Sequence, residues 1–254
     1  MAIDLDNLIS GKLQGITTNV TAAQKADHIN AGAIDILEKI KTYKQEDLQK
    51  FLVEEQVSSS EEDNWTTFNA TGLYAWEIME VKRSSTLKTA TAALEAPSQQ
   101  SWKIATRLES INKSDYSNPA SLKFIVDSFP GYTVESYSNI PNDGDNDALA
   151  NVITHGNYIV TVYPQVPSTI YHSWKIKYIP MPSATANNYN FGFHVSYYPA
   201  LAIYVAKNII LNELNRLLLL EEDIELATEL KNHYALLEQE YASLMNVPPQ
   251  KGQN

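Results

Sequence analysis

The sequence predicts an α+β fold in which helices from both ends of the chain form a bundle and an antiparallel β domain is inserted between them. Near the two ends, apolar residues recur at intervals of three and four, which is the spacing of one helix face. In the middle of the chain, apolar residues recur at every second position, as in a half-buried strand. Because each apolar stripe must be buried against another element, the terminal helices are expected to pack together as one bundle.

The composition indicates a folded, acidic protein. Hydrophobic residues make up 44% of the 254 residues, and 15 Tyr, 4 Trp and 6 Phe exclude disorder along the whole chain. The formal net charge of −11 argues against nucleic-acid binding by phosphate neutralisation. Because the sequence has no Cys, disulfides, thiolate metal ligands and a Cys nucleophile are excluded.

The sequence lacks the pattern of a membrane or targeting segment. Residues 1–8 contain acids where a secretory signal needs basic and then apolar residues. The most apolar stretch, residues 197–220, contains Lys207, Glu213 and Arg216. A membrane span needs about 18 nearly uninterrupted apolar residues. We therefore expect a protein that is made in the cytoplasm and has no membrane partner.

Residues 1–64 are expected to hold the N-terminal helices and a linker. Thr21 and Gln24 form a capping-box pattern, which marks the start of a helix. A shorter helix is predicted over residues 45–56, and the polar run at residues 58–64 predicts the linker. The longer helix has one apolar face, formed by Ala26, Ile29, Ala33, Ile36, Ile40 and Tyr43.

Residues 65–195 are expected to form the inserted β domain, as a small antiparallel sheet or a sandwich. The clearest strand is residues 170–178, where every second side chain belongs to an apolar face. One helix is expected within residues 102–111. Prolines separate the predicted strands, as is common between antiparallel strands. Aromatic and β-branched residues predict further strands at residues 73–81, 122–126, 132–137 and 158–163.

Residues 196–247 are predicted to form a helical hairpin that packs with the N-terminal helices, and residues 248–254 a flexible tail. Pro199 stands at or near the first helical position, where its missing N–H costs nothing. After the acidic residues 221–223, apolar residues from Ile224 to Leu244 recur at intervals of three and four, which predicts a seam against another helix.

The apolar stripe of the first hairpin helix is wider than one partner helix would cover. A stripe of this width predicts an exposed apolar patch, and such patches usually contact another chain. The expected subunit or partner interface comprises Tyr197, Leu201, Tyr204, Leu211, Leu214, Leu218, Tyr234 and Tyr241.

The sequence carries no recognisable catalytic motif, so we expect no enzyme activity and no cofactor. Phosphate-binding, dinucleotide-binding and nucleophile-elbow glycine patterns are absent. Asp143, Asp145 and Asp147 alternate like the first ligands of a calcium loop. However, Ala148 and Thr154 stand where such a loop needs Gly and Glu. A solvated loop is therefore favoured, and a metal-binding or hydrolytic domain that uses these carboxylates is the alternative.

The C-terminal hairpin resembles that of tailed-bacteriophage head–tail connector proteins, the adaptor or neck-ring family. The similarity is concentrated in residues 197–208, which begin Tyr-Tyr-Pro-Ala-Leu, and in residues 221–227 and 237–241. Residues 77–83 and 158–164 also resemble β segments of phage virion proteins with this ending. In order of elements, the resemblance covers residues 65–245.

The resemblance implies a non-enzymatic virion protein of the phage neck or tail. Such proteins form a homo-oligomeric ring, of about twelve copies, by closed rotational symmetry. The ring joins the portal protein to downstream tail or neck proteins, and double-stranded DNA passes through it without sequence-specific binding. In this family the helices form the ring wall, and the β insertion contacts neighbouring components. A third possibility is an assembly factor that is absent from the finished particle.

Overall fold

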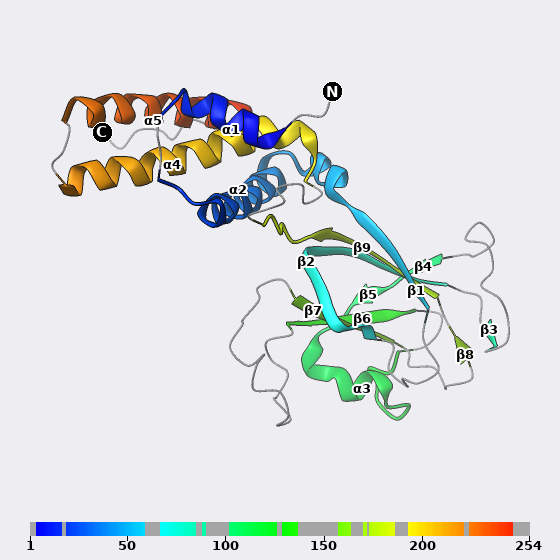
Figure 1. Ribbon diagram of the computed structural model, residues 1–254. Coiled ribbons are helices and arrows are strands. Elements are labelled where there is room, and N and C mark those ends of the chain that lie inside the picture. The colour runs from blue at the N-terminus through cyan, green and yellow to red at the C-terminus, as the bar shows by residue number, and fades with distance from the viewer. Residues whose placement is uncertain are drawn as a thin grey trace. The chain divides into compact units, whose positions relative to one another are not determined.

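The computed structural model has an α+β fold, and the chain divides into two compact units. The helical unit comprises residues Met1–Phe51 and Pro182–Asn254, and the β unit comprises residues Leu52–Met181 (Figure 1). The β unit is therefore an insertion in the sequence of the helical unit. The structure describes residues 4–16, 19–58, 67–84, 88–89, 102–125, 129–136, 157–163, 170–171, 173–185, 193–220 and 224–245.

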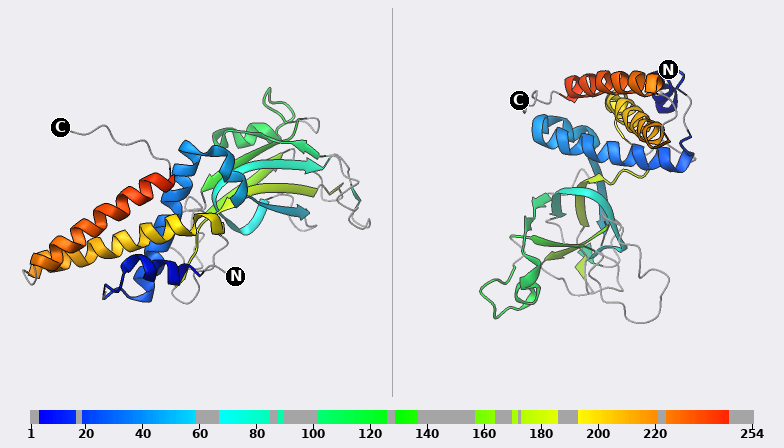
Figure 2. Two further views of the ribbon diagram at one scale, coloured as in Figure 1. Left: turned by 90° about the horizontal axis from the view of Figure 1, so that it is seen from above. Right: turned by 90° about the vertical axis from the view of Figure 1, so that its left-hand side faces the viewer.

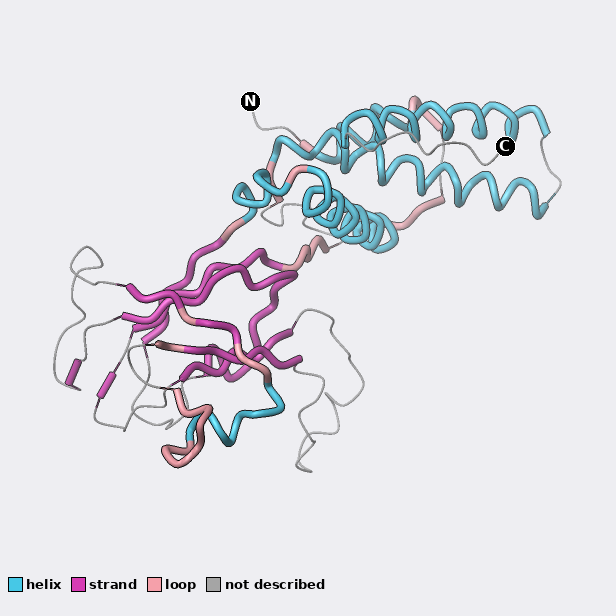
Figure 3. The backbone as a smooth tube through the Cα atoms, turned by 180° about the vertical axis from the view of Figure 1, so that it is seen from behind, coloured by secondary structure: helices cyan, strands magenta, loops and turns pink. Residues whose placement is uncertain are grey.

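Long helices from both ends of the chain build the helical unit. They are α1 (Leu5–Leu13), α2 (Ala22–Tyr43), α4 (Tyr198–Leu220) and α5 (Ile224–Met245). The helical unit also contains two short 3₁₀ helices, η1 (Gln45–Phe51) after α2 and η5 (Val195–Tyr197) before α4. Figure 3 shows these helices as coils of the tube, with α4 and α5 running side by side as a hairpin.

Local side-chain bonds fix where the first helices begin and end. The Asp4 side chain accepts a bond of 3.0 Å from the Asp6 amide and so caps α1. The predicted capping box at α2 is confirmed, since Thr21 and Gln24 each bond the other's backbone amide. Gln14, in the left-handed conformation with φ 51°, ends α1.

Helix α4 is the centre of the bundle. It packs against α1, α2 and α5, and its contact with α2 is the one that the N-terminal stripe predicts. The tightest approach is at Gly32 of α2, where an added Cβ would lie 2.6 Å from Cδ1 of Tyr204 and 2.9 Å from Cδ1 of Leu201. A glycine is therefore required there for α2 and α4 to pack this closely.

The chain is held firmly where it returns to the helical unit. Asn30 of α2 donates a bond of 3.0 Å to the Ala184 carbonyl and accepts one of 2.7 Å from the Ala184 amide. The Phe51 ring lies 4.9 Å from the Phe193 ring and 5.5 Å from that of Tyr197, measured between centroids. These contacts position the N-terminal end of α4.

The β unit is built on one long bent strand. Within the described residues the main sheet has the order β1-β9-β2-β7-β6-β5, and β4 pairs with β2. The strands are β1 (Val53–Ser58), β2 (Thr67–Ser84), β4 (Trp102–Ile104), β5 (Thr106–Arg107), β6 (Gly131–Ser136), β7 (Asn157–Tyr163) and β9 (Ser173–Pro180). A separate two-stranded sheet pairs β3 (Lys88–Thr89) with β8 (Ile170–Tyr171).

The main sheet closes on itself. The N-terminal half of β2 pairs with β7 and its C-terminal half with β9, so β2 belongs to two layers. The continuous segment β4–β5 pairs with β2 at one end and, in parallel, with β6 at the other. The interior is filled by side chains from both layers, including Trp174, Val160 and Tyr132. The predicted small sheet or sandwich is thus a compact barrel-like sheet, and Figure 2 (right) shows its curvature.

Three predicted elements are wrong. The helix predicted over residues 45–56 is the 3₁₀ helix η1 followed by strand β1, which pairs along its length with β9. Residues 102–111 form β4, β5 and a 3₁₀ turn instead of a helix, because pairing with β2 and β6 overrides the local spacing. Residues 122–125 of the predicted strand 122–126 form a turn and loop.

The unit boundaries differ from the predicted domain limits of 64/65 and 195/196. They fall at residues 51/52 and 181/182. The first boundary is earlier because β1 is part of the sheet. The second is earlier because Ala184 is bonded to α2. The predicted flexible tail at residues 248–254 lies outside the described residues, as does most of the predicted linker.

Gly32→Ala should destabilise the helical unit, because the new methyl group would overlap Tyr204 and Leu201. We expect the free energy of unfolding to fall by about 1–3 kcal/mol, measured by urea denaturation with circular dichroism. Gly11→Ala is the matched control, since an added Cβ there meets nothing within 4 Å. The free energy of unfolding of that control should rise by about 0.5–1 kcal/mol, because Ala has a higher helix propensity than Gly. Equal effects of the two substitutions would contradict the packing described for α2 and α4.

Candidate interaction site

The α4–α5 hairpin carries the side chains that the sequence selects as an interface. Its two helices pack along the predicted seam, with Ala227, Leu230, Leu237 and Tyr241 of α5 buried. The wide stripe of α4 is covered by the chain itself near the base of the hairpin. The buried residues there are Ala200, Leu201, Ala202, Ile203, Val205, Ala206, Ile209 and Ile210.

Three of the expected interface residues lie in the interior of the helical unit. Leu201 is fully buried, and Tyr197 and Tyr241 are almost fully buried. Because α1, α2 and α5 all pack on α4, Leu201 and Tyr241 belong to the interior of the bundle, and the expectation that they contact another subunit is corrected. The sequence showed an apolar stripe, but not that the first helix, α1, would help to cover it. Tyr197 is almost fully buried as well, but it lines a pocket described below.

Tyr241 is held by a partly buried polar cluster that joins α2, α4 and α5. Its hydroxyl donates to the Asp35 carboxylate, and Lys39 bonds the same carboxylate at 2.6 Å. The Lys39 ammonium lies 4.5 Å from the centroid of the Tyr241 ring, and that of Lys207 lies 4.9 Å from it. Burial, followed by the bond to Asp35, raises the pKa of Tyr241. The cluster fixes the three helices against one another.

The remaining expected residues are accessible. Tyr204, Leu211, Leu214 and Tyr234 are partly buried. Leu218 is 61% exposed, close to the end of α4. Figures 1 and 2 show the end of the hairpin projecting beyond α1 and α2. Apart from Tyr204, which packs near Gly32 at the base, the accessible residues of the predicted interface lie farther along the hairpin.

The start of α5 adds apolar residues that the predicted interface did not include. Ile224 is 83% exposed and Leu226 38%. Ile224 falls on the predicted seam, but the seam begins only at Ala227, the first buried residue of α5. We call Leu218, Ile224 and Leu226 the hairpin tip. The sequence signal for this tip is Ile224, an apolar residue that begins α5 before the first buried residue of its seam, Ala227.

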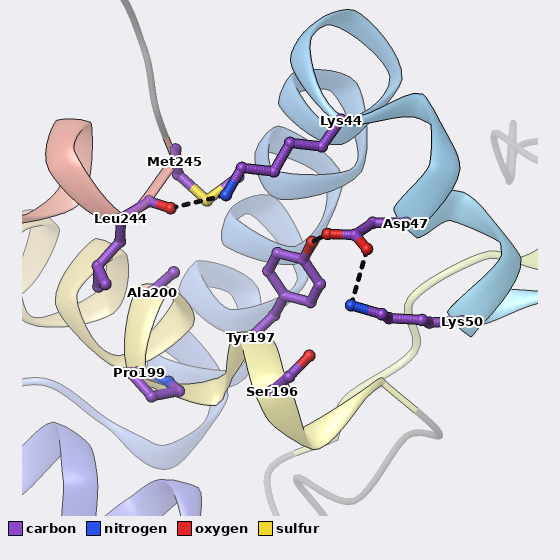
Figure 4. Close-up of a pocket in the computed structure, with 9 residues that line it drawn as sticks. All are labelled: Lys44, Asp47, Lys50, Ser196, Tyr197, Pro199, Ala200, Leu244 and Met245. Carbon is purple, nitrogen blue, oxygen red and sulfur yellow. Dashed lines mark hydrogen bonds and ion pairs between the residues drawn. The ribbon is translucent and has the colours of Figure 1, made fainter.

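A pocket of about 240 Å³ lies at the opposite end of the hairpin (Figure 4). Its polar side is formed by Lys44, Asp47, Lys50 and Tyr197, and its apolar side includes Leu244 and Met245. The Asp47 carboxylate accepts bonds from the Tyr197 hydroxyl at 2.5 Å and from Lys50 at 2.7 Å.

The charges of the pocket are organised around Asp47. The bonds from Lys50 and Tyr197 lower the pKa of the Asp47 carboxyl, so it stays ionised at neutral pH. Lys44 donates at 3.1 Å to the Leu244 carbonyl, at the negative end of α5. No spacing motif in the sequence brings these residues together, because they come from the C-cap of α2 and from η1, η5 and α5.

The residues of the alternative metal site, Asp143, Asp145 and Asp147, lie outside the described residues. In the part of the chain that the structure describes, no cluster of three or more His, Asp or Glu side chains is arranged to bind a metal ion. Over the same residues, every helix is too short or too polar to cross a membrane.

The chain matches no protein-family model and no curated protein.

Tyr241→Phe should weaken the helical unit, because the Asp35 carboxylate loses a donor in a partly buried site. The expected loss of unfolding free energy is about 1.5–3 kcal/mol near neutral pH. Tyr43→Phe is the control, since Tyr43 is 47% exposed, and it should change little.

The same variant should alter stability in alkali. Because the folded-state pKa of Tyr241 is raised above 10.0, its contribution is complete below pH 10 and is lost as the pH rises further. Denaturation curves between pH 9 and 11 should therefore fall more steeply for the wild type than for Tyr241→Phe. Parallel curves would contradict the buried tyrosine–carboxylate bond.

Proposed function

We propose that this chain is a non-enzymatic structural subunit of a bacteriophage head–tail connector. In this proposal it forms a homo-oligomeric ring between the portal protein and downstream tail or neck proteins, around the DNA channel. The observation that carries the proposal is the accessible apolar end of the α4–α5 hairpin, where Leu218 is 61% exposed and Ile224 83%. Clustered apolar residues at the end of a projecting hairpin favour contact with another chain.

The net charge of the chain supports the proposal that DNA passes the protein without being bound. With a net charge of −11, the protein repels the phosphate backbone, so a duplex could pass without being held. Binding by phosphate neutralisation would need clustered Lys and Arg, and acids outnumber these bases by 30 to 19.

Exposed apolar residues of the β unit support a role for this unit in contacts with other virion components. Ile104, Ile111, Leu122 and Phe129 are all strongly exposed on it. We assign these residues to contacts with neighbouring virion components and the hairpin to contacts between subunits. The location that follows is the neck or tail of the virion, after synthesis in the bacterial cytoplasm.

Self-association should depend on the hairpin. The wild-type chain is expected to form a species larger than a monomer in native mass spectrometry, alone or with portal protein. Leu218→Asp places a charge on the apolar contact and should shift this species to the monomer, because an unpaired charge is costly to bury. Ile111→Asp is the matched control, since Ile111 is 89% exposed on the β unit, and it should leave self-association intact.

A wild-type chain that stays monomeric with and without portal protein would contradict the proposal. Thermal melts followed by circular dichroism should be unchanged in both variants, because both positions are exposed.

A further inference from the structure

The hairpin has two accessible features at opposite ends. One is the tip, Leu218, Ile224 and Leu226, at the turn of the hairpin. The other is the pocket formed by Lys44, Asp47, Lys50 and Tyr197 where α4 begins and α5 ends. Since α4 has 23 residues at 1.5 Å each, the two features are separated by about 30 Å. The tip of a chain therefore cannot reach the pocket of the same chain.

The tip is apolar with an acidic border. Ile224 is the most exposed of its side chains at 83%. Glu225 and Glu229, in the first two turns of α5, are both exposed. Nearby Arg216 is engaged with Glu213 at 2.7 Å, on the same helix. The described tip thus presents aliphatic side chains beside carboxylates.

The pocket has the complementary chemistry. Its apolar wall includes Leu244, which is 42% exposed, and Met245. Its charged groups are the cations Lys44 and Lys50 against the single carboxylate of Asp47, whose oxygens already accept from Lys50 and Tyr197. A lysine ammonium has three donors, so both cations can bond a further carboxylate. Figure 4 shows the two ammonium groups on either side of the Tyr197 ring.

We propose that the hairpin tip of one copy of this chain docks in the pocket of a second copy. Ile224 enters against Leu244 and Met245, and Glu225 and Glu229 lie near Lys44 and Lys50. The occupant is a second copy because its tip supplies both the aliphatic group and the negative charge that the pocket lacks. This inference rests on the proposed function and names the subunit contact within it.

The contact joins different surfaces of the two copies. Such a head-to-tail contact leaves one tip and one pocket unused at the ends of any open assembly. Repetition with a closing rotation produces a ring, and repetition without closure produces a filament. A symmetric pair that uses the same patch twice would stop at a dimer.

Mixing complementary variants tests this arrangement. The tip variant is Leu218→Asp combined with Ile224→Asp. The pocket variant is Lys50→Glu, at a lysine whose side chain is 43% exposed, so the fold should tolerate it. Each variant alone should be monomeric in light scattering at a concentration where the wild type is assembled. An equimolar mixture should form a 1:1 dimer and nothing larger, since only one intact tip and one intact pocket remain.

A second pocket variant guards against an effect of charge alone. Ser196→Trp places a bulky ring at the exposed rim of the pocket, and it should also be monomeric alone and dimeric with the tip variant. If the wild type assembles and both pocket variants assemble as well, or if the mixtures stay monomeric, the head-to-tail contact is overturned and the connector proposal stands. If the wild type is monomeric at every concentration and also with portal protein, both are overturned.

Discussion

Burial of the first half of α4 is the constraint on which the helical unit depends. From Ala200 to Ile210 this helix is mostly apolar, and all of its side chains except Tyr204, Lys207 and Asn208 are buried. A helix of this kind needs cover on several sides, which α1, α2 and α5 supply. Each buried Leu or Ile contributes about 1.5–3 kcal/mol relative to an exposed one. Because α1 and α2 precede the β unit in the sequence and α4 and α5 follow it, this burial brings the two ends of the chain together.

Two hydrogen bonds between a tyrosine and a carboxylate fix the positions of the helices that this apolar packing brings together. Tyr241 bonds Asp35 across α5 and α2, and Tyr197 bonds Asp47 across η5 and η1. Both bonds lie toward the base of the hairpin, where they tie it to the N-terminal helices. The distal turns of α4 and α5 lack comparable cover, which leaves Leu218 and Ile224 exposed. The same hairpin is therefore a core element at its base and an exposed apolar surface at its end.

Helical spacing predicted α2, α4 and α5, because their apolar faces are buried along several turns. It failed where pairing partners distant in sequence decide the structure. Residues 102–107 have a helical pattern of apolar residues, yet they close the sheet between β2 and β6. Periodicity also could not separate the buried from the exposed part of one stripe. Leu201 and Leu218 look alike in sequence, but Leu201 is buried against α2 near Gly32, whereas Leu218 is 61% exposed. The pocket residues come from four elements, so only the fold brings them together.

The proposed connector role is tested most directly by a reconstruction of virions purified from cells that produce this chain. The chain is expected to occupy the neck or tail as a closed ring around the DNA channel, in contact with the portal or the next tail component. The helical hairpins should lie at the contacts between subunits, with Leu218 and Ile224 covered by a neighbour. Finding the chain absent from the finished particle, or present as isolated copies whose hairpin ends face solvent, would contradict the proposed role.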